Sequence, residues 1–207
     1  MQFACDKTGF PVVTIEGLTL SLLPVTKLQF ERFLCEPGGL SSSWYRQLLI
    51  MNPRASCRGF ADKERESLFM TGITPEEATA FLSWLDPSAR LPQETEWKRF
   101  ARLLQQVPFT RETEESLFGS GIKSSVGELL KRLIVLLKPG NLGELALIRN
   151  GVMEWVTTRS KPGGLGGPRP SFFRNTFDPY NDAPLGHFAD ERCQYYGFRV
   201  LMDQEGR

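Results

Sequence analysis

Residues 90–102 read Arg-Leu-Pro-Gln-Glu-Thr-Glu-Trp-Lys-Arg-Phe-Ala-Arg, and this stretch carries the signals of an amphipathic helix. Acidic residues stand in its first turn and basic residues follow, which is the charge order that a helix dipole favours. Apolar residues recur at three- and four-residue steps: Trp97, Phe100, Ala101 and Leu104. The stretch therefore predicts a helix from Gln93 to about Gln105 with one face buried in a core.

Upstream of this helix, the sequence predicts a short sheet and two further helices. Residues 11–23 alternate between apolar and polar types, which indicates one or two strands with a turn near residues 16–17. Thr26 is a suitable N-cap for a helix that follows it at once. Residues 74–77 read Thr-Pro-Glu-Glu, a capping box with proline at the first helical position, and predict a helix that ends at Asp86.

Downstream of residue 106, the sequence predicts fewer regular elements. Residues 107–128 are polar and are interpreted as mainly loop, followed by an apolar helix at 125–137 within a helical insertion at 122–138. Short strands joined by long loops are expected beyond this helix, at residues 144–148, 152–157, 172–175 and 196–202. The whole chain is thus predicted to be one α+β domain, residues 1–207.

Composition excludes several classes of function. The 207 residues are 41% hydrophobic and 24% charged, which is ordinary for one globular domain. A net charge of +1 gives no bulk attraction to nucleic acid, and no apolar run approaches the roughly 20 residues that span a bilayer. The four cysteines lack close spacing and the N-terminus shows no export signal, so a cytoplasmic protein with reduced thiols is expected.

Two further motifs stand near the C-terminus. Residues 151–156 read Gly-Val-Met-Glu-Trp-Val, and residues 196–200 read Tyr-Gly-Phe-Arg-Val. Together with residues 90–102, and in this order, they resemble the formylglycine-generating enzyme (sulfatase-modifying factor) family over about residues 12–203. The resemblance implies a loop-rich C-type lectin-like fold with short antiparallel strands and about four helices.

The motif residues themselves are interpreted as mainly structural. Trp97 and Trp155 are expected to fill the core, because burying an indole contributes a few kcal/mol at about 25 cal/mol per Å². Arg199 is expected to bond to a buried carboxylate or to backbone carbonyls rather than to a ligand.

The enzymatic chemistry of the family depends on residues that this chain lacks. Its enzymes oxidise a cysteine with oxygen and a copper ion held by two cysteines, and one thiolate cannot supply that linear ligation. Between residues 157 and 197 the chain has only Cys193. A related branch binds iron through three histidines, whereas this chain has one, His187. The sequence thus favours a pseudoenzyme, with an atypical cysteine-modifying oxidase that uses Cys193 as the alternative.

Calcium is the one cofactor that the resemblance suggests. Family members often bind it through an Asn and a Glu around the turn of the second motif, with carbonyl oxygens completing the shell. The corresponding residues here are Asn150 and Glu154. The competing interpretation is that Glu154 binds loop amides or forms an ion pair with Arg174.

The C-terminal loops are rich in residue types that protein interfaces favour. The candidate partner-binding residues are Phe173, Arg174, Asn175, Phe177, Tyr180, Asn181 and Tyr195. We therefore predict a bacterial-type, non-catalytic recognition module, or a subunit of a multiprotein assembly, that binds a protein. A variable ligand-binding protein of a diversity-generating retroelement is a second alternative. Carbohydrate is not expected as the ligand, because the Glu-Pro-Asn and Gln-Pro-Asp triplets of calcium lectins are absent.

Overall fold

A computed structural model of the chain describes residues 1–35, 68–148, 153–157 and 196–203. Within these ranges it is a mixed α+β structure with six helices, a five-stranded antiparallel sheet and a two-stranded parallel sheet. The predicted α+β class is confirmed at this level. The expected number of about four helices is too low, because two short helices lie where a loop and a strand were predicted.

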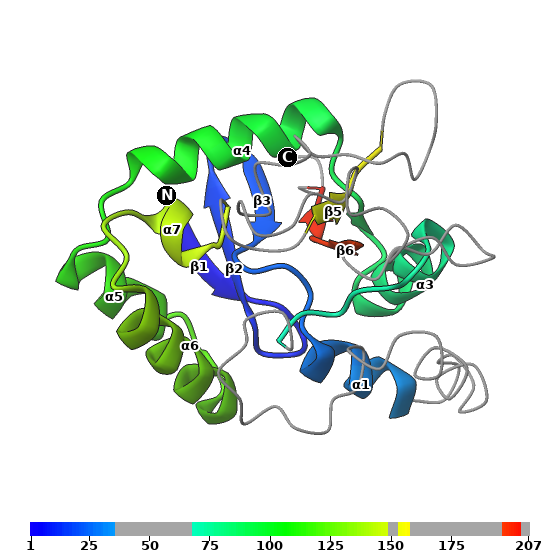
Figure 1. Cartoon of the computed structure of the whole chain (residues 1–207), viewed down its shortest axis with the longest axis horizontal. Coiled ribbons are helices and arrows are strands. Elements are labelled where there is room, and N and C mark those ends of the chain that lie inside the picture. Colours follow the sequence, from blue (N-terminus) through cyan, green and yellow to red (C-terminus); the bar gives the residue numbers. More distant parts are fainter. Residues whose placement is uncertain (36–67, 149–152, 158–195, 204–207) are drawn as a thin grey trace, which may run out of the picture.

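The five-stranded sheet combines strands from both ends of the chain (Figure 1). Its strand order is β1-β2-β3-β7-β4, and every neighbouring pair is antiparallel. The strands are β1 (Gln2–Cys5), β2 (Pro11–Ile15), β3 (Leu18–Ser21), β4 (Ala89–Arg90) and β7 (Leu201–Met202). Because β7 lies between β3 and β4, the C-terminal strand joins the N-terminal hairpins to the middle of the chain.

The turn between β2 and β3 falls at the predicted position. Ile15 pairs with Leu18, which leaves Glu16 and Gly17 as the two turn residues. Their φ angles are 48° and 79°, the positive values that tight two-residue hairpin turns require. The hairpin prediction is therefore confirmed.

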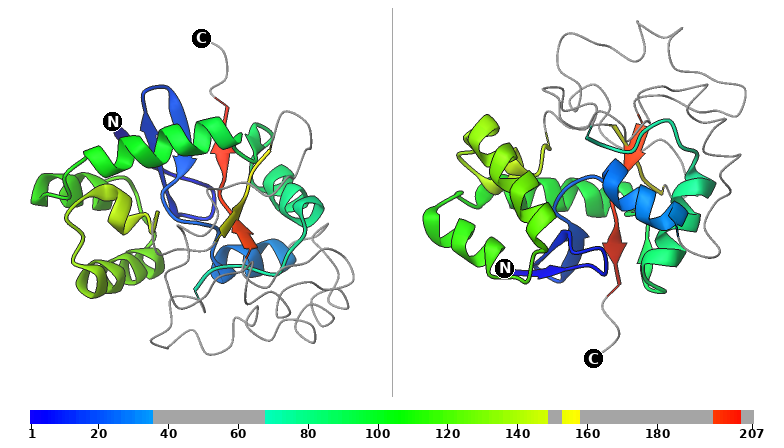
Figure 2. Two further views of the ribbon diagram at one scale, coloured as in Figure 1. Left: turned by 45° about the horizontal axis from the view of Figure 1, so that its top comes forward. Right: turned by 90° about the horizontal axis from the view of Figure 1, so that it is seen from below.

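The helices lie in groups around the strands (Figures 1 and 2). α4 runs across the strands, α1 and α3 lie together at one side, and α5 and α6 lie together at the opposite side. Their bounds are α1 (Lys27–Cys35), α3 (Pro75–Leu85), α4 (Glu94–Gln106), α5 (Arg111–Phe118), α6 (Ser124–Leu137) and α7 (Leu142–Leu145). The described helices include none that is both long and apolar enough to cross a membrane.

Side-chain caps determine where these helices begin. The Thr74 hydroxyl accepts a hydrogen bond from the Glu77 amide, and the Glu77 carboxylate accepts one from the Thr74 amide, so the predicted capping box of α3 is confirmed. Thr26 and Gln29 make the equivalent reciprocal pair at the start of α1. α4 begins one residue after Gln93, close to the predicted start.

Two predictions for the region after α4 are wrong. α5 forms within residues 107–128, where mainly loop was expected, because the Thr110 hydroxyl caps the helix and Leu117 is buried beneath it. Residues 144–148 do not form a strand. Asn141 caps the short helix α7 by accepting a hydrogen bond from the Glu144 amide, and a turn follows.

The remaining predictions for the C-terminal half hold in part. α6 starts one residue before its predicted position and lies within the predicted insertion at 122–138. The strand expected at 196–202 is divided into β6 (Tyr196–Phe198) and β7, with Arg199 at the break. β5 (Met153–Trp155) forms within the predicted strand at 152–157. The strand expected at 172–175 lies outside the described residues.

A continuous hydrophobic core lies between the helices and the sheet. The predicted face of α4 is buried, with Trp97 2% and Phe100 0% exposed. An aromatic group joins α1, α3 and β6, in which ring centroids of neighbours lie 5.4–5.7 Å apart: Phe30, Phe33, Phe81, Trp84 and Phe198. These contacts hold α1 and α3 against β6.

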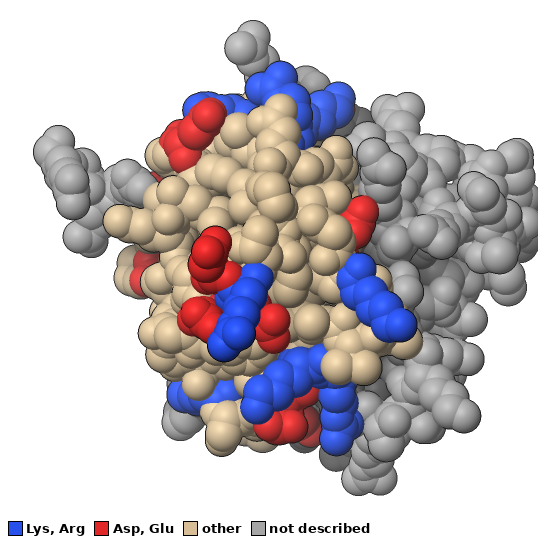
Figure 3. Space-filling view, turned by 90° about the vertical axis from the view of Figure 1, so that its left-hand side faces the viewer, with Lys and Arg blue, Asp and Glu red and all other residues tan. Residues whose placement is uncertain are grey.

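The side of the molecule formed by α5 and α6 has a mixed surface (Figure 3). Acidic and basic side chains lie next to one another over its lower part, and an uncharged area separates them from further charged side chains at the upper margin. α6 packs on the body through Val126, Leu130 and Leu133, which are 0–5% exposed. This helix is therefore an integral part of the core.

Candidate functional site: the frame of residues 158–195

The residues predicted to bind a partner lie outside the described part of the chain. These are Phe173, Arg174, Asn175, Phe177, Tyr180, Asn181 and Tyr195, and the same holds for Asn150, His187 and Cys193. The structure instead describes the residues that flank this segment on both sides. These flanking residues form the frame that holds the two ends of residues 158–195.

Two short strands form the inner part of this frame. β5 and β6 pair in parallel, with Met153 opposite Tyr196 and Trp155 opposite Phe198. Because parallel neighbours point the same way, the chain that leaves one strand must cross over before it enters the next. The 158–195 segment begins shortly after β5 and ends directly before β6. The paired strands therefore fix both ends of this segment.

A buried ion pair locks β5 to the residue that follows β6. Arg199 donates from Nη2 to Glu154 Oε1 over 2.9 Å and from Nε to Glu154 Oε2 over 3.1 Å. Both side chains are 0% exposed. Such two-pronged contacts between guanidinium and carboxylate fix orientation as well as distance. Together with Trp97, these residues are called the clamp below.

Arg199 uses all five of its N–H donors inside the protein. In addition to Glu154, it donates to the carbonyl oxygens of Ser21 over 3.0 Å, of Ala146 over 3.1 Å and of Leu22. The expectation that Arg199 bonds to a buried carboxylate or to backbone carbonyls is confirmed in both respects. No donor of this side chain is left for a ligand.

Trp97 connects α4 to the same carboxylate. Its Nε1 donates to Glu154 Oε2 over 2.8 Å, and the Phe100 ring of the same helix lies 5.8 Å from the centre of the Arg199 guanidinium. Trp97 and Trp155 are 2% and 5% exposed, which confirms both as core residues. Each of the three sequence motifs thus contributes one residue to the clamp. Their shared function could not be seen in the sequence, where the motifs stand tens of residues apart.

Glu154 is also one of the two predicted calcium ligands. Both of its oxygens accept hydrogen bonds from Arg199 or Trp97. Asn150 lies outside the described residues, so the predicted pair cannot be assembled and calcium stays a prediction. Within the described ranges, no group of three or more His, Cys, Asp or Glu side chains is arranged to hold a metal ion.

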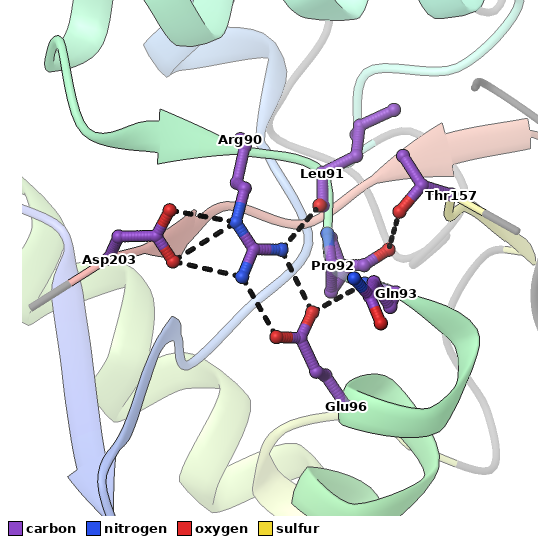
Figure 4. Close-up of polar contacts among 7 residues, drawn as sticks. All are labelled: Arg90, Leu91, Pro92, Gln93, Glu96, Thr157 and Asp203. Carbon is purple, nitrogen blue, oxygen red and sulfur yellow. Dashed lines mark hydrogen bonds and ion pairs between the residues drawn. The ribbon is translucent and has the colours of Figure 1, made fainter. Parts of the chain in front are cut away.

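A second, more exposed network supports the frame from outside (Figure 4). Arg90 donates from Nε to the Asp203 carboxylate over 2.9 Å and from Nη1 and Nη2 to the Glu96 carboxylate over 2.8 Å each. Glu96 Oε2 also accepts from the Gln93 amide over 2.7 Å. The hydrogen bonds from Arg90 hold the pKa of Glu96 below its usual range. This Arg90 network joins the start of α4 to the residue after β7.

Thr157 fixes the point at which the chain leaves the frame, and its hydroxyl donates to the Pro92 carbonyl over 3.4 Å (Figure 4). Its amide donates to the Pro92 carbonyl over 2.9 Å, and its carbonyl accepts from the Glu94 amide over 3.1 Å. The Glu94 amide belongs to the first turn of α4, where amides lack partners within the helix. The residue that precedes the 158–195 segment is therefore held by the N-terminus of α4.

A third polar cluster lies elsewhere, at the turn between β1 and β2. Asp6 is buried and accepts from the amides of Thr8 and Phe10, from the Thr8 hydroxyl and from Gln29 Nε2. Burial raises the pKa of Asp6 in spite of these donors. The cluster was not predicted from the sequence. It joins the first hairpin to α1 and therefore has a structural role.

Comparison with known proteins adds no family to this geometry. A scan against protein-family models finds no match, and a search of the curated proteins finds no similar sequence. The resemblance to the formylglycine-generating enzyme family therefore rests on the three motifs and stays a prediction.

Proposed function

We propose that this protein is a non-catalytic recognition module with the C-type lectin-like fold of the formylglycine-generating enzyme type. In this proposal it binds a protein partner, as a subunit of a multiprotein assembly, through side chains of the 158–195 segment. Neither calcium nor another cofactor is needed for this function, and carbohydrate is not the ligand. We place the protein in the cytoplasm, where its thiols stay reduced.

The observation that carries the proposal is the clamp. Recognition residues are often carried on loops, and their affinity depends on how well a rigid scaffold fixes the loop ends. Here three motifs converge on Glu154, and the segment that is rich in aromatic, Arg and Asn residues leaves directly from this cluster. Arg199 has no donor left for a partner, so in this proposal the clamp only supports the segment. The side chains of residues 158–195 make the contacts with the partner.

The cysteines support a function without thiol chemistry. Cys193 is the only cysteine between the second and third motifs, where the enzymes of the family have their pair. Cys5 stands on β1, and burial raises the pKa of its thiol, which lowers its reactivity. Cys35 is exposed at the end of α1.

A comparison of captured proteins tests the proposal. The wild type, the double variant Phe173→Ala/Tyr195→Ala and the control Lys98→Ala, an exposed residue of α4, are used to capture proteins from the source cells. We expect at least one protein to be retained by the wild type and the control but lost with the double variant. Its affinity for the purified wild type should then exceed that for the double variant by at least about tenfold, as expected when interface aromatics are removed.

Two other outcomes would replace the proposal. Oxygen uptake with a cysteine peptide, dependent on added copper and lost in Cys193→Ser, would identify the atypical oxidase. Sister sequences that differ only at positions such as 173, 175, 181 and 195 would identify the variable protein of a diversity-generating retroelement. Equal binding of every captured protein to the wild type and to Phe173→Ala/Tyr195→Ala would rule out the proposed surface.

A further inference from the structure

The outer surface of α6 exposes hydrophobic side chains that the core does not use. Three large hydrophobic side chains are exposed among the described residues: Met1 at 53%, Val135 at 72% and Leu136 at 58%. Two of these three are neighbours in the last turn of α6. Single exposed apolar residues are common. We interpret this adjacent pair, on a helix whose inner side is well packed, as part of a contact surface.

The position of the pair along the helix supports this interpretation. The inner side of α6 packs into the core through Val126, Leu130 and Leu133. Val135 and Leu136 instead continue the outer stripe of residues 128, 131 and 132, because positions three and four apart share one side of a helix. The hydrophobic pair therefore extends a charged, solvent-facing stripe.

Charge on this side of the molecule has opposite sign on neighbouring helices. Lys131 and Arg132 are exposed on α6, and Glu112 and Glu115 are exposed on α5. The two helices follow one another in the chain on the same side of the molecule (Figure 1), and Phe118 of α5 lies close to Gly127 of α6.

These charges are only partly paired within the chain. Lys131 pairs with Glu128 and Arg111 with Glu115, each within its own helix. Neither Arg132 nor Glu112 has an ion-pair partner in the described part of the chain. Within the described residues, α6 thus carries an unpaired cation three and four residues before the hydrophobic pair, and α5 carries an unpaired anion.

We propose that the α5–α6 surface binds a second copy of this chain around a two-fold axis. In a two-fold contact the same patch meets itself, so it must be complementary to itself. Val135 and Leu136 meet their counterparts at the axis. Arg132 and Lys131 of each copy face Glu112 and Glu115 of the other.

The mixed charge of the surface favours this occupant over others. Nucleic acid or an anionic membrane would select a surface of one positive sign, whereas red and blue side chains alternate on this side (Figure 3). A second copy supplies both signs at the required places. This inference does not depend on the proposed function.

Charge exchange between two variants of the full chain tests the proposal. One variant carries Lys131→Glu and Arg132→Glu, and the other carries Glu112→Lys and Glu115→Lys. In the proposed dimer each variant alone places like charges opposite one another, whereas a mixture of the two restores opposite charges at both contacts. Sedimentation equilibrium should show a wild-type dimer, two weakened variants and a mixed dimer in the equimolar mixture. We expect each variant alone to associate at least about tenfold more weakly than the wild type.

Two further variants complete the design. Val135→Asp/Leu136→Asp should be monomeric, and Lys98→Glu, a charge reversal on α4, should dimerise like the wild type. All variants must show the far-ultraviolet circular dichroism of the wild type, which separates loss of association from loss of fold. A monomeric wild type at high micromolar concentration, or a dimer that Val135→Asp/Leu136→Asp leaves intact, would overturn the proposal.

Discussion

The clamp and the Arg90 network join the same kinds of groups in different surroundings. Glu154 and Arg199 are both 0% exposed, whereas the side chains of Arg90, Glu96 and Asp203 are 36%, 22% and 56% exposed. Water screens the second set and cannot reach the first. Two arginines that make similar forked contacts therefore differ in how much they contribute to the stability of the fold. We expect loss of the buried arginine to destabilise the fold strongly and loss of the exposed one to change stability only slightly.

Replacing one member of the clamp should have the largest effect. We expect Arg199→Met to lower the free energy of unfolding by about 3–5 kcal/mol, because it leaves a buried carboxylate without its counter-ion. Arg90→Met should lower it by about 1 kcal/mol or less, because its partners are hydrated. Urea unfolding followed by tryptophan fluorescence measures both. Equal losses for the two variants would break the comparison.

Removing both charges of the clamp sharpens this prediction. In Glu154→Leu/Arg199→Met no buried charge is left unpaired, so the double variant should lose less stability than Arg199→Met alone. The same urea titration measures the difference. A double variant less stable than Arg199→Met would show that the pair itself, and not the orphaned carboxylate, determines the loss.

Two tryptophan replacements compare a charged with a neutral acceptor. Trp97 donates to the Glu154 carboxylate over 2.8 Å, and Trp155 donates to the Ile73 carbonyl over 2.9 Å. Both Trp97→Phe and Trp155→Phe remove an indole donor from the core, so the loss of volume is matched. We expect Trp97→Phe to be the more costly by about 1 kcal/mol, because hydrogen bonds to charged groups are the stronger. Thermal unfolding checks the order, and the reverse order would contradict it.

Salt concentration should affect the Arg90 network and the clamp differently. The expected change in the free energy of unfolding is smaller than in the predictions above. The cost of Arg90→Gln, about 1 kcal/mol or less at low ionic strength, should shrink in 1 M sodium chloride because exposed charges are screened. The cost of Arg199→Met should change little, because no ions reach the buried pair. Urea titrations at both salt concentrations make the measurement. A similar salt dependence for both variants would mean that the clamp is hydrated.

The smallest expected effect depends on pH. The pKa of Glu96 is lowered in the folded protein by Arg90, so its stabilising contribution is present above the ordinary glutamate value of about 4.3. This contribution is lost as pH falls through the lowered folded value, because the folded state binds the proton less readily than the unfolded state. Unfolding free energies of the wild type and Glu96→Gln should therefore converge from pH 6 to pH 3. A gap that widens toward low pH would contradict the assigned direction.

Local signals in the sequence predicted the elements that local chemistry determines. The turn at residues 16–17, the Thr74 capping box and the buried face of α4 depend on residues close together in the chain, and all three were predicted correctly. α5 was missed because its Thr110 cap lies within a polar stretch with little apolar periodicity. The expected strand at 144–148 became α7 because Asn141 offered a cap that outweighed the apolar pattern.

The clamp could be predicted only in part. The sequence indicated that Arg199 bonds internally, but its acceptors come from residues 21, 22, 146 and 154, which are distant in the chain. No spacing rule joins such positions, because tertiary folding brings them together. The predicted partner-binding side chains lie outside the described residues.

The place of β7 in the sheet has a consequence for biosynthesis. Leu201 pairs with both Leu20 and Arg90, so the strands on either side of it stay apart until the ribosome has released the last residues of the domain. Contacts between such distant positions form slowly. We therefore expect β3 to lack a partner on this edge until residues 201–202 have been synthesised.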